Sequence, residues 1–260
     1  MLAHVLACTW TASPSGIHRL VPDACLDLLW IDSGRRLLLC GPETTAWDFA
    51  LPDGTTAVGV RYRPGVAAPL FGIDISTIRN QRVLVAGLIG QPSADALGEQ
   101  VEAANSPSRR VAVLERFVTA QVDGTASGVP VPDPVAEQIL NVLASSPRAS
   151  ASELAAGLGI TTRQLHRRSM GAFGYGTSTL ARLLRFQRFL AVAEADAVTG
   201  SARSLARLAA QAGYTDQAHL GRDCRAITGR TPAAFLTGYF PTFPDMSDPY
   251  KTEDRFTLTL

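Results

Sequence analysis

The sequence predicts an α+β protein with a β-rich N-terminal half and an all-α C-terminal half. In the first 80 residues, short apolar runs alternate with Pro, Gly and Asp at strand-and-turn spacing. Beyond residue 134 the apolar residues recur at helical spacing almost throughout. Between the two regions lies Asp123–Pro134, which is rich in Gly, Ser and Pro and has no periodicity. A chain of 260 residues has room for two such domains.

The expected strands lie at Cys25–Ile31, Arg36–Leu39 and Thr55–Tyr62. In the first of them, apolar residues occupy every second position from Leu26 to Trp30. Alternation with a period of two puts those side chains on one face of a sheet. We therefore expect half-buried strands that pack on one side.

Helical spacing begins past residue 75, with helices expected at Asp95–Ala104 and Arg109–Gln121. Asp133 is expected to cap a helix that begins with Pro134, and a long helix is expected over Leu180–Glu194. We divide the chain into a β-rich sensor or oligomerisation domain with trailing helices (1–124), a linker (125–133), an all-α domain (134–240) and a tail (241–260).

The charge is distributed unevenly along the chain. The formal net charge is only +1, from 24 basic and 23 acidic residues. Residues 148–230, however, hold 12 Arg, no Lys and five acidic residues, a net charge of +7. A basic block inside a nearly neutral chain indicates contact with a polyanion such as nucleic acid.

Several classes of protein are disfavoured. No run of about 18 apolar residues exists, and the N-terminus lacks a basic region, so neither a membrane span nor a signal peptide is expected. The cysteines have no short paired spacing, which argues against a zinc knuckle or disulfide framework and favours the reducing cytoplasm. Only His4 and His18 lie outside the basic block, so no metal site is expected. We expect no cofactor and no catalytic residue.

A near-repeat lies within the basic block. Leu154–Thr161 resembles Leu208–Thr215, with a spacing of 54 residues between Gly159 and Gly213. In each copy, small Ala residues allow two helices to cross closely, and the glycine supplies the turn between them. The pattern predicts two helix-turn-helix motifs, joined by the long helix.

The second helix of each motif is expected to enter the DNA major groove with its N-terminal residues. Thr161 and Gln164 form a capping box that sets where this helix begins in the first copy. Arg can bond guanine and Gln can bond adenine, so the residue types suit base readout. These positions hold Arg163, Gln164, His166 and Arg167 in the first copy and Gln217, Ala218, His219, Gly221 and Arg222 in the second. Phosphate contacts are expected from Arg168, Arg185 and Arg225.

Two such motifs on one chain could reach successive major-groove segments about 34 Å apart. The predicted partner is therefore double-stranded DNA with a bipartite site, which one chain reads without dimerising.

Residues 148–238 resemble the double helix-turn-helix domain of the AraC/XylS family of bacterial transcription regulators. The most specific stretch is Leu205–Phe235, with its Leu-Ala, Gly-Tyr, His-Leu, Arg and Gly-x-Thr-Pro elements. The resemblance implies base contacts at Arg163, His166, Arg167, Gln217, Ala218, Gly221 and Arg222. Ser169 and Cys224 stand where the family usually has Phe, and the first copy lacks the closing proline. These departures predict looser packing or less stringent DNA reading by the first copy.

Residues 2–90 are similar to an uncharacterised domain found in front of AraC-type modules. The resemblance lies in Pro22–Leu29, Cys40–Glu43 and Val58–Gly65, followed by Phe71 and Gly72. It implies a β-rich sensory or assembly domain, for which a cupin-like fold is one candidate.

Together these features predict a sequence-specific transcription regulator whose N-terminal domain senses an effector or oligomerises. RNA polymerase, a small-molecule effector and a second copy of the chain are further candidate partners. Trp30, Trp47 and Arg61 are candidates for an effector pocket, although each Trp alone is as readily explained as core. The helices around 95–121, with Phe117, suit either a dimer face or plain packing.

The alternative is a DNA-associated enzyme, or a redox sensor with a helix-turn-helix targeting module. Nearby Arg residues can activate a Cys thiolate. Cys25 and Cys40 lie in apolar strand runs, however, and Cys8 precedes them, so buried structural thiols are the competing interpretation. A methyl-accepting enzyme would need a cysteine in a zinc or Pro-Cys-His setting, and the sequence has none.

Overall fold

The computed structural model describes residues 2–13, 16–124, 133–199 and 204–239. In its N-terminal half, two antiparallel sheets follow from the predicted alternation. Five strands pair in the order β1-β6-β3-β4-β7, and β2 and β5 form a separate pair. The strands are β1 Leu6–Ala12, β2 Ile17–Leu20, β3 Leu26–Ile31, β4 Arg36–Cys40, β5 Trp47–Ala50, β6 Ala57–Tyr62 and β7 Arg82–Leu84. The described strands therefore form two sheets, and not one closed barrel.

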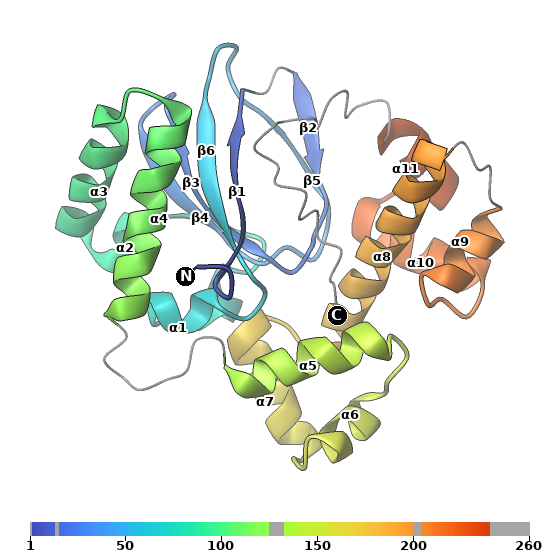
Figure 1. The fold of residues 1–260 in the computed structure, drawn as a ribbon. Coiled ribbons are helices and arrows are strands. Elements are labelled where there is room, and N and C mark those ends of the chain that lie inside the picture. The colour runs from blue at the N-terminus through green and yellow to red at the C-terminus, as the bar shows by residue number, and fades with distance from the viewer. Residues whose placement is uncertain (1, 14–15, 125–132, 200–203, 240–260) are drawn as a thin grey trace.

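Helices cover one face of the five-stranded sheet (Figure 1). The helices of this half are α1 Ala67–Phe71, the 3-10 helix η1 Ile75–Ile78, α2 Ala86–Ile89, α3 Gln91–Ala103 and α4 Pro107–Asp123, and of these α3 and α4 lie over the sheet. Ser106 caps α4 by accepting from the Arg109 amide, and Val111, Leu114 and Val118 bury one stripe of it against the sheet. The two trailing helices predicted from the sequence are confirmed as α3 and α4.

The C-terminal half is helical in its described residues. It consists of α5 Pro134–Ser145, α6 Ala151–Gly157, α7 Thr162–Phe173, α8 Thr177–Thr199, α9 Leu205–Gln211, α10 Gln217–Thr228 and α11 Pro232–Tyr239. The α5 helix begins at Pro134 with Asp133 as its cap, as predicted. The expected long helix is α8. Residues 125–132 and 240–260 lie outside the described residues, so the linker and tail stay predictions.

Each half has its own core. The N-terminal core lies between the five-stranded sheet and its helices, and the C-terminal core surrounds α8. Leu183, Phe186 and Phe189 of α8 are buried there. Two N-terminal residues also belong to the C-terminal core: Ala24 is buried in it and Val21 packs against it. Among the described helices, none is long and apolar enough to cross a membrane.

Candidate nucleic-acid interface

The two predicted helix-turn-helix motifs are confirmed as α6–α7 and α9–α10. Their first helices bury equivalent residues: Leu154 and Ala155 in α6, Leu208 and Ala209 in α9. The turns pass through Gly159 and Gly213, whose φ angles of +65° and +88° lie in the left-handed region that favours glycine. The repeat in the sequence is therefore a repeat in structure.

Side-chain caps fix where both second helices begin. In α7, the Thr161 hydroxyl accepts from the Gln164 amide, and the Gln164 side chain accepts from the Thr161 amide at 2.8 Å. This is the predicted capping box. In α10, the Asp216 carboxylate accepts from the His219 amide at 2.7 Å. Each recognition helix thus presents a defined first turn to solvent.

The first turns of α7 carry the predicted base readers on the surface. Leu165 and Ser169 point into the core, so the intervening side chains lie outside. The exposed predicted residues are Arg163, Gln164, His166, Arg167 and Arg168. Because the Gln164 carbonyl oxygen is used in the cap, its amide NH₂ is the part left to bond a base. Arg168 approaches Asp133 at 3.4 Å.

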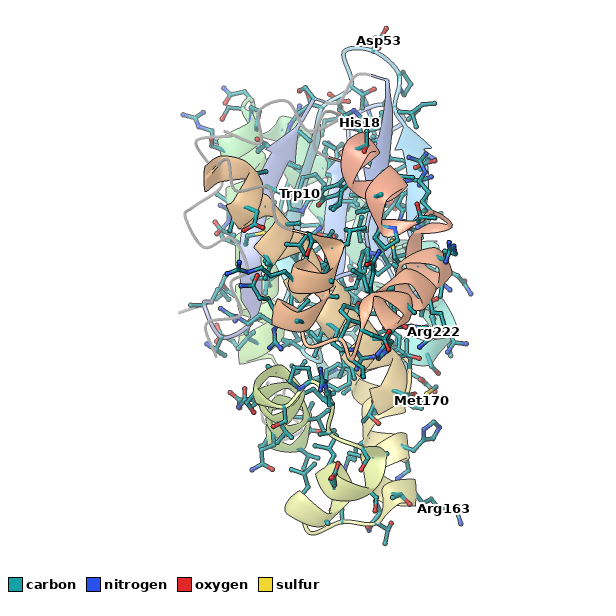
Figure 2. All side chains as sticks on the ribbon, turned by 90° about the vertical axis from the view of Figure 1, so that its right-hand side faces the viewer. Trp10, His18, Asp53, Arg163, Met170 and Arg222 are labelled. Carbon is teal, nitrogen blue, oxygen red and sulfur yellow. The ribbon has the colours of Figure 1, made fainter. Side chains whose placement is uncertain are left out.

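In α10, Gln217, Ala218 and Arg222 are exposed, while His219 and Gly221 are not. His219 stands edge-on to the Tyr214 ring, and its Nε2 lies 3.7 Å from the Asp223 carboxylate. Its ring therefore packs within the domain and is only 28% exposed. Gly221 is buried and contributes only backbone. Figure 2 shows Arg163 and Arg222 on the same side of the molecule, one below the other.

Part of the positive charge of residues 148–230 is used inside the domain. Arg148 donates to the carbonyls of Gly213 and Tyr214, and Arg188 donates to the carbonyl of Ala144. These bonds satisfy carbonyl groups at turns and helix ends. Fewer positive charges are therefore available at the surface for DNA than the net charge of +7 indicates.

Arg185, predicted as a phosphate contact, is placed in the interior. Its side chain is 13% exposed, and it donates to the Pro147 carbonyl at 2.8 Å and to Asp223 at 3.4 Å. Its guanidinium also lies 5.7 Å from the centre of the Tyr214 ring. Helical spacing alone does not show which partners bury an arginine of this helix. Arg168 and Arg225, the other predicted phosphate contacts, are exposed.

The structure does not bring Trp30, Trp47 and Arg61 together. Trp30 lies on the helix-covered face, where its ring is near Gly98 of α3. Arg61 lies on the opposite face of the same sheet. It is paired across the strands with Asp27, and the side chains of Asp27 and Trp30 point to opposite faces of β3. The alternation of β3 thus separates two of the three predicted pocket residues.

An ionic cluster surrounds Arg61 instead. Its guanidinium donates to Asp23 at 2.8 Å and to Asp27 at 2.8 and 3.0 Å. The Trp10 ring N–H donates to Asp27 at 2.9 Å. The ring lies so close to Gly59 that a Cβ added to this glycine would be 2.5 Å from the ring. Sequence reasoning did not predict the contact between Trp10 and Asp27. The available signal was Gly59, a glycine inside a strand, which often marks a close approach.

The two sheets face each other across the Arg61 side. Arg82 of β7 lies 3.5 Å from the centre of the Trp47 ring in β5 and pairs with Glu43 at 2.5 Å. Burial raises the pKa of Glu43 to about 7, although Arg82 opposes the rise. We call this side of the five-stranded sheet, with the opposed side of β5, the inter-sheet face. Its half-buried apolar residues are Trp10, Leu29, Leu38, Trp47 and Phe49.

Cys25 and Cys40 lack the lowered pKa of a reactive thiol. Cys25 is buried, which raises the pKa of its thiol well above the usual value, and burial raises the pKa of Cys40 to about 12. A thiol becomes a nucleophile through a lowered pKa. Within residues 2–13, 16–124, 133–199 and 204–239, no three His, Cys, Asp or Glu side chains gather as metal ligands.

Two capped recognition helices with exposed Arg and Gln in their first turns define a helix-turn-helix DNA-binding transcription regulator. Comparison with protein families agrees. Residues 154–238 match a family described as "Helix-turn-helix domain". Residues 1–84 match a "Domain of unknown function (DUF6597)".

Solved structures of ToxT from Vibrio cholerae are similar to this chain. ToxT from strain O395 is 12% identical with a TM-score of 0.46, and covers 88% of this chain and 97% of its own. ToxT bound to (E)-4-(8-methylnaphthalen-1-yl)but-3-enoic acid is 13% identical with a TM-score of 0.45, and covers 88% and 98%. No curated protein sequence matches the chain.

Proposed function

We propose that this regulator reads a bipartite DNA site through its two recognition helices, one in each of two successive major-groove segments. The observation that carries the proposal is that α7 and α10 expose their first turns while one continuous helix, α8, joins the motifs. Base contacts come from Arg163, Gln164, His166 and Arg167 in α7 and from Gln217, Ala218 and Arg222 in α10, with the Gly221 backbone close to the groove. Arg168 and Arg225 hold phosphates.

The chemistry of the two helices differs, and we assign different half-sites to them. In α7, Arg163 and Arg167 suit guanine, which offers two acceptors to a guanidinium. In α10, Gln217 suits adenine and the Ala218 methyl suits the thymine methyl group. The half-site under α7 is therefore G-rich, and the one under α10 contains A·T pairs beside the guanine bonded by Arg222.

The inter-sheet face supports an effector-sensing role for the N-terminal domain. Its apolar residues remain half-exposed, whereas Leu28 and Leu39 on the other face are fully buried. The Arg61 and Asp27 charges lie beside that apolar surface, and such a combination suits a small molecule with a polar group. The protein acts by binding and not by catalysis, in the bacterial cytoplasm where its DNA lies. RNA polymerase and a second copy of the chain are the further partners that we propose.

Selection from a random DNA pool with the full-length chain tests DNA reading. The same selection is repeated with cell metabolites present, to test for an effector. Enrichment of a two-part motif is expected. Arg222→Ala should then cost about 1–3 kcal/mol on the selected site and relax the preference at one base pair. Arg168→Ala should weaken binding to all sequences alike, as a phosphate contact does. Arg116→Ala removes the same charge at an exposed position of α4 and is the control. It should change neither the affinity for DNA nor the sequence preference. A pool without enrichment would contradict the proposal.

A further inference from the structure

The segment Val21–Cys25 lies between the Arg61 cluster and the DNA-binding domain. It follows β2 and precedes β3, so it belongs to the N-terminal domain by sequence. By packing it belongs to both domains, because Val21 and Ala24 join the C-terminal core. Ala24 has a left-handed φ of +69°, which is unusual for a residue with a side chain. Such a conformation persists only where its surroundings hold it.

The Asp23 carboxylate holds this turn with both of its oxygens. Its Oδ1 accepts from the Cys25 amide at 3.0 Å, which closes the turn around Ala24. Its Oδ2 accepts from Arg61 at 2.8 Å, which ties the turn to the five-stranded sheet. Both side chains of this ion pair are 27% exposed, so water screens it only in part.

On its other side the turn contacts the helix that joins the two motifs. Gln187, near the middle of α8, donates from its side-chain amide to the Pro22 carbonyl at 2.6 Å. The α8 helix packs against both motifs, through α7 at one end and through α9 and α10 at the other. Its attachment to the N-terminal domain therefore influences how the two recognition helices are placed relative to each other.

We infer that Asp23 is a positioning residue for DNA reading: by shaping the Val21–Cys25 turn it anchors α8 at Gln187 and so contributes to the spacing at which α7 and α10 meet the two half-sites. The inference rests on the proposed bipartite reading. It also gives the inter-sheet face a route to the DNA-binding domain, because a ligand that competes for Arg61 acts directly on Asp23.

The test compares full-length variants on DNA of different spacing. The DNAs are the selected bipartite site and the same site with one or two base pairs inserted between its halves. For the wild type, insertion should lower affinity sharply. Asp23→Asn keeps an acceptor for the Cys25 amide but loses the ion pair. It should bind the uninterrupted site about 5- to 10-fold more weakly than the wild type does, which is a typical coupling between sites. Its affinity for the sites with inserted base pairs should equal that of the wild type.

Gln187→Leu removes the same anchor from the other domain and should flatten the spacing preference equally. The double variant should be no worse than either single variant, because both act through one contact. Glu102→Gln, which breaks the Arg35–Glu102 pair away from the turn, is the matched control and should keep the wild-type profile. An equal loss of affinity at every spacing, or an unchanged spacing preference in both variants, would overturn the inference.

Amide exchange in the DNA-free protein separates this inference from the proposed function. Asp23→Asn and Gln187→Leu should both speed exchange in the middle of α8, while Glu102→Gln should not. If no DNA site is selected but α8 responds in this way, bipartite reading fails and the anchor stands. If a site is selected and α8 exchange is unchanged, the anchor fails and the proposed function stands.

Discussion

Arg185 in α8 donates a hydrogen bond to Asp223 in α10, with 3.4 Å between Nη2 and Oδ2. Both side chains are only 13% exposed. The second recognition helix is therefore attached to the connecting helix by a largely buried charge pair. Tyr214 completes this contact, since the Arg185 guanidinium lies over its ring and His219 stands edge-on to it.

Arg185→Ala is expected to destabilise the protein and not merely to weaken DNA binding. It would leave the Asp223 carboxylate buried beside His219 alone, and it would leave the Pro147 carbonyl without its donor. The free energy of unfolding should fall by about 2–4 kcal/mol, as measured by urea denaturation. Arg168→Ala, the loss of an exposed arginine, should change it by less than about 0.5 kcal/mol. If Arg185→Ala leaves the unfolding free energy unchanged, the structural role of Arg185 is contradicted and the earlier prediction of a phosphate contact is favoured.

Thr161→Ala should remove the capping box of the first recognition helix. The Gln164 amide then loses its hydroxyl acceptor at the N-terminus of α7. We expect the unfolding free energy to fall by about 1 kcal/mol, measured by thermal unfolding. Thr162→Ala, one residue later and equally exposed, is the control and should have little effect. Equal losses in the two variants would show that the cap contributes nothing.

Gly59→Ala should displace the Trp10 ring. The new Cβ would lie 2.5 Å from the ring, and moving the ring breaks its hydrogen bond to Asp27. Overpacking of this kind costs about 1–3 kcal/mol. Thermal unfolding measures the loss, and tryptophan fluorescence should shift as the indole changes its surroundings. Gly87→Ala adds a Cβ where nothing lies within 4 Å, and should keep the wild-type stability.

Glu43 should make stability depend on pH. Its pKa of about 7 in the folded protein lies above the ordinary value of 4.5, so the folded state binds the proton more tightly than the unfolded chain. The resulting stabilisation is complete below 4.5 and is lost as pH rises through about 7. The unfolding free energy of the wild type, relative to Glu43→Gln, should therefore decrease from about pH 5 to about pH 8. Urea denaturation measures it. A difference that stays constant over this range would contradict the raised pKa.

The local pattern predicted most of the secondary structure and which side chains of α7 are exposed. The cap at Thr161 and the buried positions at Leu165 and Ser169 act within one or two helical turns. They therefore determine from the sequence which side chains of α7 face outward. The strands around Trp30 followed from alternation for the same reason.

Long-range contacts account for the predictions that changed. Arg185 resembles an exposed helical arginine until α10 supplies Asp223, 38 residues later in the chain. Trp30 and Arg61 are both strand residues, and only the pairing register of β3 with β6 shows that they lie on opposite faces. Trp10 and Asp27 gained their roles in the same way, through a contact 17 residues apart that no local spacing encodes.

By itself, the sequence determined that this is a two-part chain with a repeated helix-turn-helix unit, because periodicity, caps and glycine turns are local properties. Only the tertiary structure decided which charges face outward, where the inter-sheet face lies, and that Asp23 bonds Arg61 while Gln187 bonds Pro22 between the two halves. These depend on which distant segments meet in space, since a buried charge takes its role from the partner that packing brings to it.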